Sequence, residues 1–194
     1  MKRLILGLLL CGLSVSHAAT AAPEADLWER WTAHDDSSEA TIDHAAWTEF
    51  LGKYLREDDE DVTRLDYGGV EAADRERLDR YIARLADVPI SEYSRTEQFP
   101  YWVNLYNAVT VDIVLEHYPV DSIRDIDISP GWFSSGPWGA KLVTVEDEEL
   151  SLDDIEHRIL RPIWSDPRIH YAVNCASVGC PDLQAEAFTP EDME

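Results

Sequence analysis

The stretch QFPYWVNLYNAVTVDIVLEHY, residues 98–118, decides the fold. A capping box, Ser94-Arg95-Thr96-Glu97, precedes it and is typical of a helix start, while Pro119 predicts the helix end. Pro100 predicts that the helix either begins there, with proline in its first turn, or kinks there. Between Trp102 and Leu115 the pattern is apolar around most of the circumference, which predicts a central, buried helix.

The segments around this stretch predict the elements that cover the central helix. Apolar side chains recur at helical spacing over residues 44–55 and 71–85, and Ser151 caps a further helix expected to run to residue 160. Short strands are expected at residues 62–67, 142–145 and 169–174. These patterns predict an α+β fold: helices surround a buried central helix, with a small sheet that contains residues 142–145 and 169–174.

The N-terminus has the layout of a secretory signal peptide. Met1-Lys2-Arg3 is positive, residues 4–15 are almost wholly apolar, and small residues follow up to residue 22. An uncleaved membrane anchor is disfavoured, because about 12 apolar residues are fewer than the roughly 20 that span a bilayer. A lipid on Cys11 is disfavoured because Leu10 stands where a small residue is usual. We expect an exported protein, periplasmic or extracellular, with no stable membrane span after cleavage.

The composition restricts the partners of the chain. It has 16 Lys and Arg residues and 39 Asp and Glu residues, which gives a net charge of −23. A surface with this charge repels nucleic acid. We therefore expect no nucleic-acid partner. The acidic run at residues 57–61 lacks the spaced ligands of a calcium loop, which favours a solvated loop. We divide the chain into a signal peptide (1–22), an N-terminal helical and acidic segment (23–61) and a main domain (62–194).

One cluster of candidate residues lies in the middle of the central helix. Asn104 and Asn107 are three residues apart and therefore lie near one helix face. A buried carboxamide without partners costs about 1–3 kcal/mol, so these side chains either hold neighbouring backbone in place or line a polar pocket. Bracing of backbone is favoured, because buried polar groups are usually paired. Trp102 and Tyr106 complete the cluster as candidate binding residues.

Two histidines outside the central helix are further candidates. Asp153 and His157 are four residues apart on an expected helix, a spacing that lets the carboxylate orient the imidazole. His170 and Asn174 are expected to point to one side of the strand at residues 169–174, and sites of open sheets gather at strand ends. We predict that the asparagine face, both histidines and the cysteine loop after Asn174 meet in one place.

Cys175 and Cys180 have three alternative chemistries. They are the only cysteines after the signal peptide, and an even pair in an oxidising compartment is by default a disulfide. Cys175 is alternatively a thiolate nucleophile with His157 or His170 as its base. A zinc site of cysteines and histidines is the third alternative, although Cys-x4-Cys is not a common zinc spacing. The disulfide is favoured, and we assign no metal ligand and no cofactor.

Four sequence blocks resemble the family known as domain of unknown function 547. They are EQ at residues 97–98 with YWVNLYNA at 101–108, HYPVDSI at 117–123, LDDIEH at 152–157 and DPRIHYAVNCASVGCP at 166–181. The resemblance covers about residues 60–194. It implies exported bacterial relatives, relatives within larger plant and animal proteins, and no settled activity. It also implies further helices, so a C-terminal part is expected to follow the helix start Thr189-Pro190-Glu191-Asp192.

These observations favour an exported domain that binds a small molecule or a partner at a motif-rich pocket. The candidate binding residues are Trp102, Tyr106, Asn107, Asn174 and Cys180. The first alternative is a cysteine-dependent hydrolase or acyl transferase, and the second is a zinc-dependent hydrolase. The candidate catalytic residues are Cys175, His170, His157 and Asn104. Whether the chain is an enzyme stays open at this level.

Overall fold

The helix predicted from residues 98–118 is the axis of the molecule. The computed structural model describes residues 24–57, 62–131, 135–177 and 179–193, and in it α3 runs from Arg95 to His117. Ser94 Oγ accepts a hydrogen bond from the Glu97 amide at 3.3 Å, which confirms the predicted cap. Pro100 lies inside α3, so the helix does not start there. The expected signal peptide and residues 58–61 of the acidic run lie outside the described residues.

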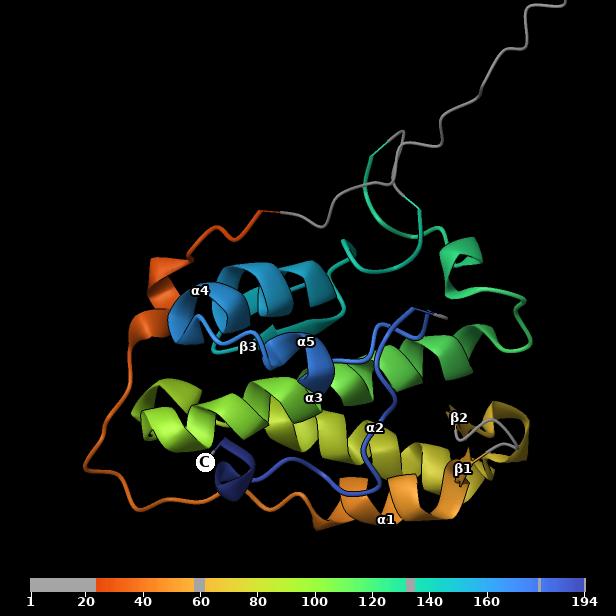
Figure 1. Cartoon of the computed structure of the whole chain (residues 1–194), viewed down its shortest axis with the longest axis horizontal. Coiled ribbons are helices and arrows are strands. Elements are labelled where there is room, and N and C mark those ends of the chain that lie inside the picture. Colours follow the sequence, from red (N-terminus) through yellow and green to blue (C-terminus); the bar gives the residue numbers. More distant parts are fainter. Residues whose placement is uncertain (1–23, 58–61, 132–134, 178, 194) are drawn as a thin grey trace, which may run out of the picture.

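Further elements lie on both sides of α3 (Figure 1). On one side α2 (Ala72–Ala86) packs against α3, and α1 (Ala45–Tyr54) packs against α2. On the other side lie a short hairpin, the π-helix η5 (Asp154–Leu160) and the short helices α4 (Arg161–Trp164) and α5 (Ile169–Ala172). Five 3-10 turns among the described residues connect these elements: Glu29–Thr32, Tyr67–Gly69, Ile90–Glu92, Ile123–Asp125 and Pro190–Met193. The predicted α+β fold around a buried central helix is confirmed.

The strands form two separate antiparallel hairpins. β1 (Leu55–Glu57) pairs with β2 (Thr63–Leu65), and β3 (Val143–Val145) pairs with β4 (Glu148–Leu150). The strands expected at residues 62–67 and 142–145 are therefore present. The second hairpin closes through Glu146 and Asp147, both at positive φ (46° and 67°), as a two-residue hairpin turn requires.

Residues 169–174 do not form the predicted strand and do not join a sheet with β3. They contain α5, which begins after an Asp-Pro start: the Asp166 side chain accepts a hydrogen bond from the Arg168 amide at 2.8 Å. The buried side chains there are Ile169, Ala172 and Val173. Their i, i+3, i+4 spacing is that of a helix face. The strand alternation predicted for residues 169–174 is therefore wrong.

The helix expected over residues 151–160 is a π-helix for most of its length. Ser151 caps it as predicted, since the Asp154 amide donates to Ser151 Oγ at 3.1 Å. The Ser151 amide in turn donates to Asp154 Oδ2 at 2.9 Å. From Asp154 to Leu160 the helix is a π-helix. Such helices are rare in proteins, and those that occur are often found at functional sites. This segment carries Glu156 and His157.

An aromatic cluster joins the N-terminal segment to the rest of the molecule. The ring centres of Trp31 and Trp102 lie 5.0 Å apart in an edge-to-face arrangement. Trp47 of α1 belongs to the same hydrophobic core. Residues from the segment 23–61 therefore share one core with α3.

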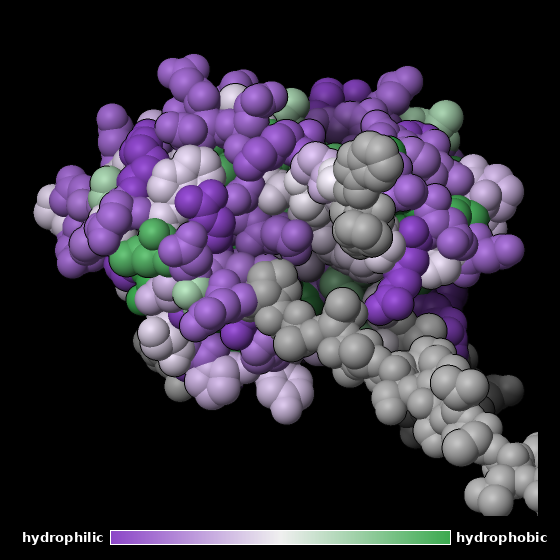
Figure 2. All heavy atoms as spheres, turned by 90° about the horizontal axis from the view of Figure 1, so that it is seen from above, coloured by the Kyte–Doolittle hydropathy of each residue, from purple (hydrophilic) through white to green (hydrophobic). Residues whose placement is uncertain are grey.

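Few large hydrophobic side chains are exposed among the described residues, as the large excess of carboxylates predicts. On the face seen in Figure 2, hydrophobic residues gather only in small separate areas. Among the described residues, no helix combines the length and the apolar character needed to cross a bilayer.

Candidate functional site

Asn104 and Asn107 clamp two backbone segments that come later in the chain. Asn104 is fully buried; its Oδ1 accepts from the Phe188 amide at 2.9 Å and its Nδ2 donates to the Phe188 carbonyl at 2.8 Å. Asn107 Oδ1 accepts from the Asn174 amide at 2.8 Å, and its Nδ2 donates to the Ala172 carbonyl at 2.9 Å. Both side chains have the backbone-bracing role that the sequence favoured.

Asn174 holds the cysteine loop in shape. Its Oδ1 accepts from the Ala176 amide at 2.9 Å, and its Nδ2 donates to the Pro181 carbonyl at 2.6 Å. The structure joins Cys175 and Cys180 by a disulfide, with their Cα atoms 5.9 Å apart. The favoured cysteine chemistry is therefore the one observed, and one covalent bond and two hydrogen bonds fix a loop of a few residues.

Trp102 and Tyr106 serve the core in this structure. Both are about 1% exposed. The Trp102 ring packs edge-on against Tyr101 at 4.9 Å, and the Tyr106 hydroxyl lies 3.5 Å from Glu156 Oε2. Burial raises the pKa of Tyr106 well above its usual value, so the phenol stays protonated. Neither ring offers a surface to a ligand in this conformation.

Glu156, on the π-helix, is the centre of a second polar group. Its Oε1 lies 3.8 Å from Nδ1 of His157 and 3.8 Å from Nδ1 of His170. Burial raises the pKa of Glu156, and the neighbouring His170 and Arg161 side chains oppose this shift. The Glu156 carboxylate is thus a partly buried acidic group that faces two imidazoles.

The two histidines of this group differ in environment. Arg161 Nη1 lies 2.8 Å from Nδ1 of the buried His157. Burial lowers the pKa of His157 to about 4, with further contributions from Arg161 and His170, so its ring is neutral at neutral pH. Its Nε2 lies 3.9 Å from Asp153 Oδ1. This distance, like the 3.8 Å to Glu156, is an ion-pair contact beyond hydrogen-bond length. The His170 side chain is 54% exposed and open to solvent.

A groove of about 510 Å³ opens beside the disulfide loop. Its walls come from β2, from the end of α3 with the turn after it, and from the loop itself. Asn174 and Cys180 line it. So do Tyr67 and Tyr118, whose rings stack with centres 6.3 Å apart. Tyr118 is 49% exposed, so about half of this residue is accessible to solvent.

The contacts of the candidate residues define two sets of side chains. The loop group consists of Asn107, Asn174, Cys175 and Cys180; the Glu156 group consists of Tyr106, Glu156, His157 and His170. Neither histidine is among the described residues that line the groove. Asn104 turns to Phe188. Asn107 contacts the carbonyl of Ala172, two residues after His170, and the single meeting place predicted from the sequence stays a prediction for the remaining residues.

A comparison with known protein families finds a match to the segment that contains both groups. The model of a family described as "Protein of unknown function, DUF547" matches residues 90–194. The chain belongs to this family. The match begins before α3 and covers every residue of the loop group and of the Glu156 group, which confirms the resemblance seen in the sequence. No curated protein and no solved structure matches the chain.

The chemistry open to the DUF547 domain depends on its cysteines. In the disulfide, Cys175 carries no thiolate, so the cysteine-dependent alternative requires a reduced loop. In the described part of the chain, no three His, Cys, Asp or Glu side chains come together as metal ligands. The zinc-dependent alternative therefore has no ligand set among these residues.

The sequence patterns do not single out two polar residues of the DUF547 domain, Glu156 and Gln98. Gln98 is 1% exposed, and its Nε2 donates to the carbonyls of Ile90 (2.8 Å) and Ala33 (3.0 Å). It thereby ties the N-terminal segment to α3. A polar residue at the edge of an apolar helix was the available signal for Gln98. The signal for Glu156 was its place beside His157, but only the tertiary structure brings His170 to it.

Proposed function

We propose that this DUF547 protein is an exported binding domain whose ligand occupies the groove beside the disulfide loop. The observation that carries the proposal is that two of the four motif blocks supply walls of this groove. The block at residues 117–123 contributes Tyr118 and Ser122, and the block at 166–181 contributes Asn174 and Ser177. A volume of about 510 Å³ suits a small organic molecule.

The rigidity of the loop wall supports the same proposal. The disulfide and the hydrogen bonds of Asn174 fix the loop from within, and Asn107 fixes its start to α3. A ligand that meets a preformed wall does not have to order it, which improves affinity. The half-exposed Tyr118 beside polar side chains suits a molecule with a ring face and hydrogen-bonding groups.

Amide NMR spectra recorded during titration with small polar ring-containing fragments test this site. We expect shifts to concentrate in residues 118–123 and 174–183. The variant Ser177→Trp places an indole in the groove and is expected to abolish these shifts at equal fragment concentrations. The matched control, Ser38→Trp, makes the same change in a turn that does not line the groove, and it is expected to preserve them. Shifts that survive in Ser177→Trp, or that fall on other segments, would refute the assignment.

Export is the second part of the proposal, and it rests on the positive, apolar and small-residue pattern of residues 1–22. Mass spectrometry of protein taken from cells is expected to find a new N-terminus between Ala19 and Pro23. Iodoacetamide should modify neither cysteine of the folded protein until a reductant is added. An intact Met1 would contradict export. Stoichiometric labelling of Cys175 without reductant would contradict the disulfide and favour the cysteine-dependent hydrolase.

A further inference from the structure

The charges of the groove beside the disulfide loop indicate the class of molecule that it binds. Asp121 and Asp182 line this groove, and both residues are exposed. Neither carboxylate forms an ion pair with a cation in the described part of the chain. Arg64 is the single basic residue among the described residues of the lining, which therefore carries one net negative charge. A cation is attracted to such a surface, and the charge of −23 on the whole chain acts in the same direction.

Asp182 is held in position in the wall of the groove. Its Oδ2 accepts a hydrogen bond from the backbone amide of Thr63 at 3.0 Å, which ties the residues after the disulfide loop to β2. An ionised carboxylate can accept several hydrogen bonds on its two oxygens, so this contact leaves acceptor capacity for a ligand. Asp182 thus combines a fixed position with a negative charge that no described cation compensates.

Tyr118 brings an aromatic side chain to the same groove. The residue is half-exposed, and its ring stacks on that of Tyr67. Its hydroxyl also lies close to Gly68, where an added Cβ atom would come within 2.9 Å of the hydroxyl oxygen. These two contacts position the Tyr118 ring in the groove wall. Tyrosine rings attract organic cations at their faces, and binding sites for ammonium groups use such rings.

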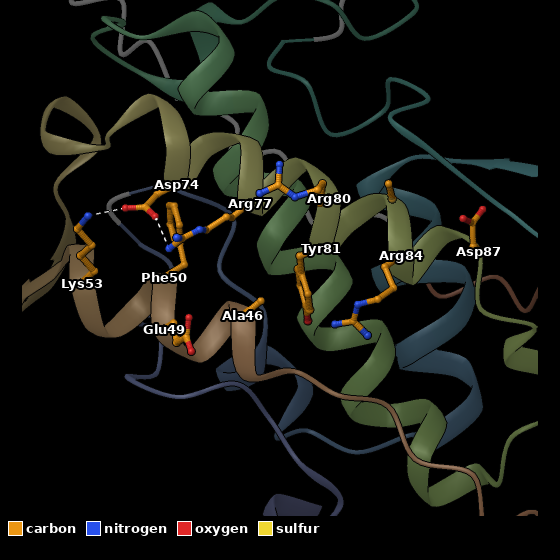
Figure 3. A pocket seen from close by; sticks show the side chains of 11 residues that line it. Ala46, Glu49, Phe50, Lys53, Asp74, Arg77, Arg80, Tyr81, Arg84 and Asp87 are labelled. Atoms are coloured by element: carbon orange, nitrogen blue, oxygen red, sulfur yellow. Dashed lines mark hydrogen bonds and ion pairs between the residues drawn. The ribbon is translucent and has the colours of Figure 1, made fainter.

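A larger groove, of about 710 Å³ between α1 and α2, lacks this arrangement. Its carboxylate Asp74 lies 2.5 Å from Lys53 Nζ and 3.1 Å from Arg77 Nη1, the contacts drawn in Figure 3. Its aromatic residues Phe50 and Tyr81 are buried. Because this carboxylate is paired and these rings are covered within the protein, the α1/α2 groove serves as a control site.

We infer that the groove beside the disulfide loop binds a small organic cation, an ammonium group on an apolar body. The ammonium group lies near the carboxylates of Asp121 and Asp182, and the apolar body lies against Tyr118. The inference rests on the proposed function, which supplies the groove, and it adds the charge class of the ligand.

Three probes with the same phenyl ring test the charge class by amide NMR titration at pH 7. They are the cation 2-phenylethylammonium, the neutral 2-phenylethanol and the anion phenylacetate. The cation is expected to bind about tenfold more tightly than the alcohol, the combined scale of a cation–π contact and exposed ion pairs. Phenylacetate should bind more weakly than the alcohol, and added salt should reduce the preference for the cation. The shifts should fall in residues 118–123 and 174–183.

A pair of double variants separates the two carboxylates from the net charge of the protein. Asp121→Asn/Asp182→Asn removes both charges but keeps a side-chain oxygen for the Thr63 amide. It is expected to bring the affinity of the cation to within about twofold of that of the alcohol, and to leave the alcohol unaffected. Asp125→Asn/Asp127→Asn removes the same charge from exposed residues outside the lining and should keep the preference.

Two single variants test the aromatic wall and the location of the site. Tyr118→Leu removes the ring and should weaken the cation more than the alcohol. Ala46→Trp fills the α1/α2 groove and should change none of the three affinities. Amide spectra recorded without a probe verify that each variant is folded. Loss of cation binding in Ala46→Trp would place the cation in the wrong groove and overturn the inference.

The other outcomes distinguish a failure of this inference from a failure of the proposed function. If 2-phenylethanol or phenylacetate binds at these amides as tightly as the cation, the inference is overturned and the groove remains a ligand site. A preference for the cation that survives in Asp121→Asn/Asp182→Asn would also overturn the inference. If none of the three probes shifts these amides, both the inference and the proposed function are overturned.

Discussion

Replacing Asn107 by alanine is expected to destabilise the protein by about 3 kcal/mol and to loosen the disulfide loop. Asn107 accepts a hydrogen bond from the Asn174 amide and donates one to the Ala172 carbonyl. Both backbone groups lose this partner when the carboxamide is removed. Each buried backbone group left without a partner costs about 1–3 kcal/mol. The start of the loop then has no fixed attachment to α3, so its amides should exchange hydrogen faster.

Urea unfolding and hydrogen exchange measure the two parts of this expectation. Asn104→Ala is the matched control, because it makes the same change on the same helix but releases Phe188 instead. The two variants should lose similar stability, while only Asn107→Ala raises exchange in residues 174–183. A stability loss below about 1 kcal/mol for both, or equal exchange in the loop, would contradict the clamp.

Replacing Asp154 by alanine is expected to cost about 3 kcal/mol at neutral pH, because the buried carboxylate joins three partners. Its oxygens accept hydrogen bonds from Lys141 at 2.5 Å, from the Ser151 amide at 2.9 Å and from Arg158 at 3.0 Å. Asp154→Ala therefore removes the carboxylate that connects Lys141, just before the hairpin β3–β4, to the start of the π-helix. Chemical unfolding at pH 7 measures the loss.

The pH dependence of this loss follows from the pKa of Asp154. Burial alone would raise that pKa, but hydrogen bonds from Lys141, Ser151 and Arg158 outweigh it and lower the pKa to about 2. Because the folded pKa is below the unfolded value, the stabilisation is complete above about pH 4 and is lost as the pH falls toward 2. The difference between Asp154→Ala and the parent protein should therefore shrink below pH 4.

Asp153 supplies the matched control for Asp154. It is the preceding carboxylate, its side chain is 45% exposed, and burial with the charge of Asp154 raises its pKa. Asp153→Ala should change the free energy of unfolding by less than about 0.5 kcal/mol, as is usual for surface substitutions. A similar cost for both variants would mean that the partners of Asp154 do not account for its effect.

The sequence predicts the parts of this molecule that depend on local pattern. The capping box at Ser94 and the apolar circumference of residues 102–115 are both local signals, and α3 confirms them. Paired polar atoms are the usual state of buried amides, so the bracing role of Asn104 and Asn107 was also predictable. Their actual partners were not, because these lie 84 and 65 residues later in the chain.

The remaining features depend on tertiary contacts or on short, ambiguous segments. The apolar pattern of residues 169–174 fits both the alternation of a strand and the spacing of a helix face. Only the burial of Ile169, Ala172 and Val173 shows that the segment is helical. The π-helix has no sequence signal in apolar spacing. Phe50 of α1 and Tyr81 of α2 stack on the same tryptophan, Trp47, whereas the sequence showed them only as members of two separate helix faces.

The amide clamps of α3 also set an order of events in folding. The helix is made of residues 95–117, yet the backbone that pairs with the Asn104 and Asn107 carboxamides arrives only with residues 172–188. Until then these carboxamides are paired with water, and burying the helix fully would strip them of partners. A chain emerging from its N-terminus therefore completes its core late and through contacts distant in sequence, the topology that slows folding.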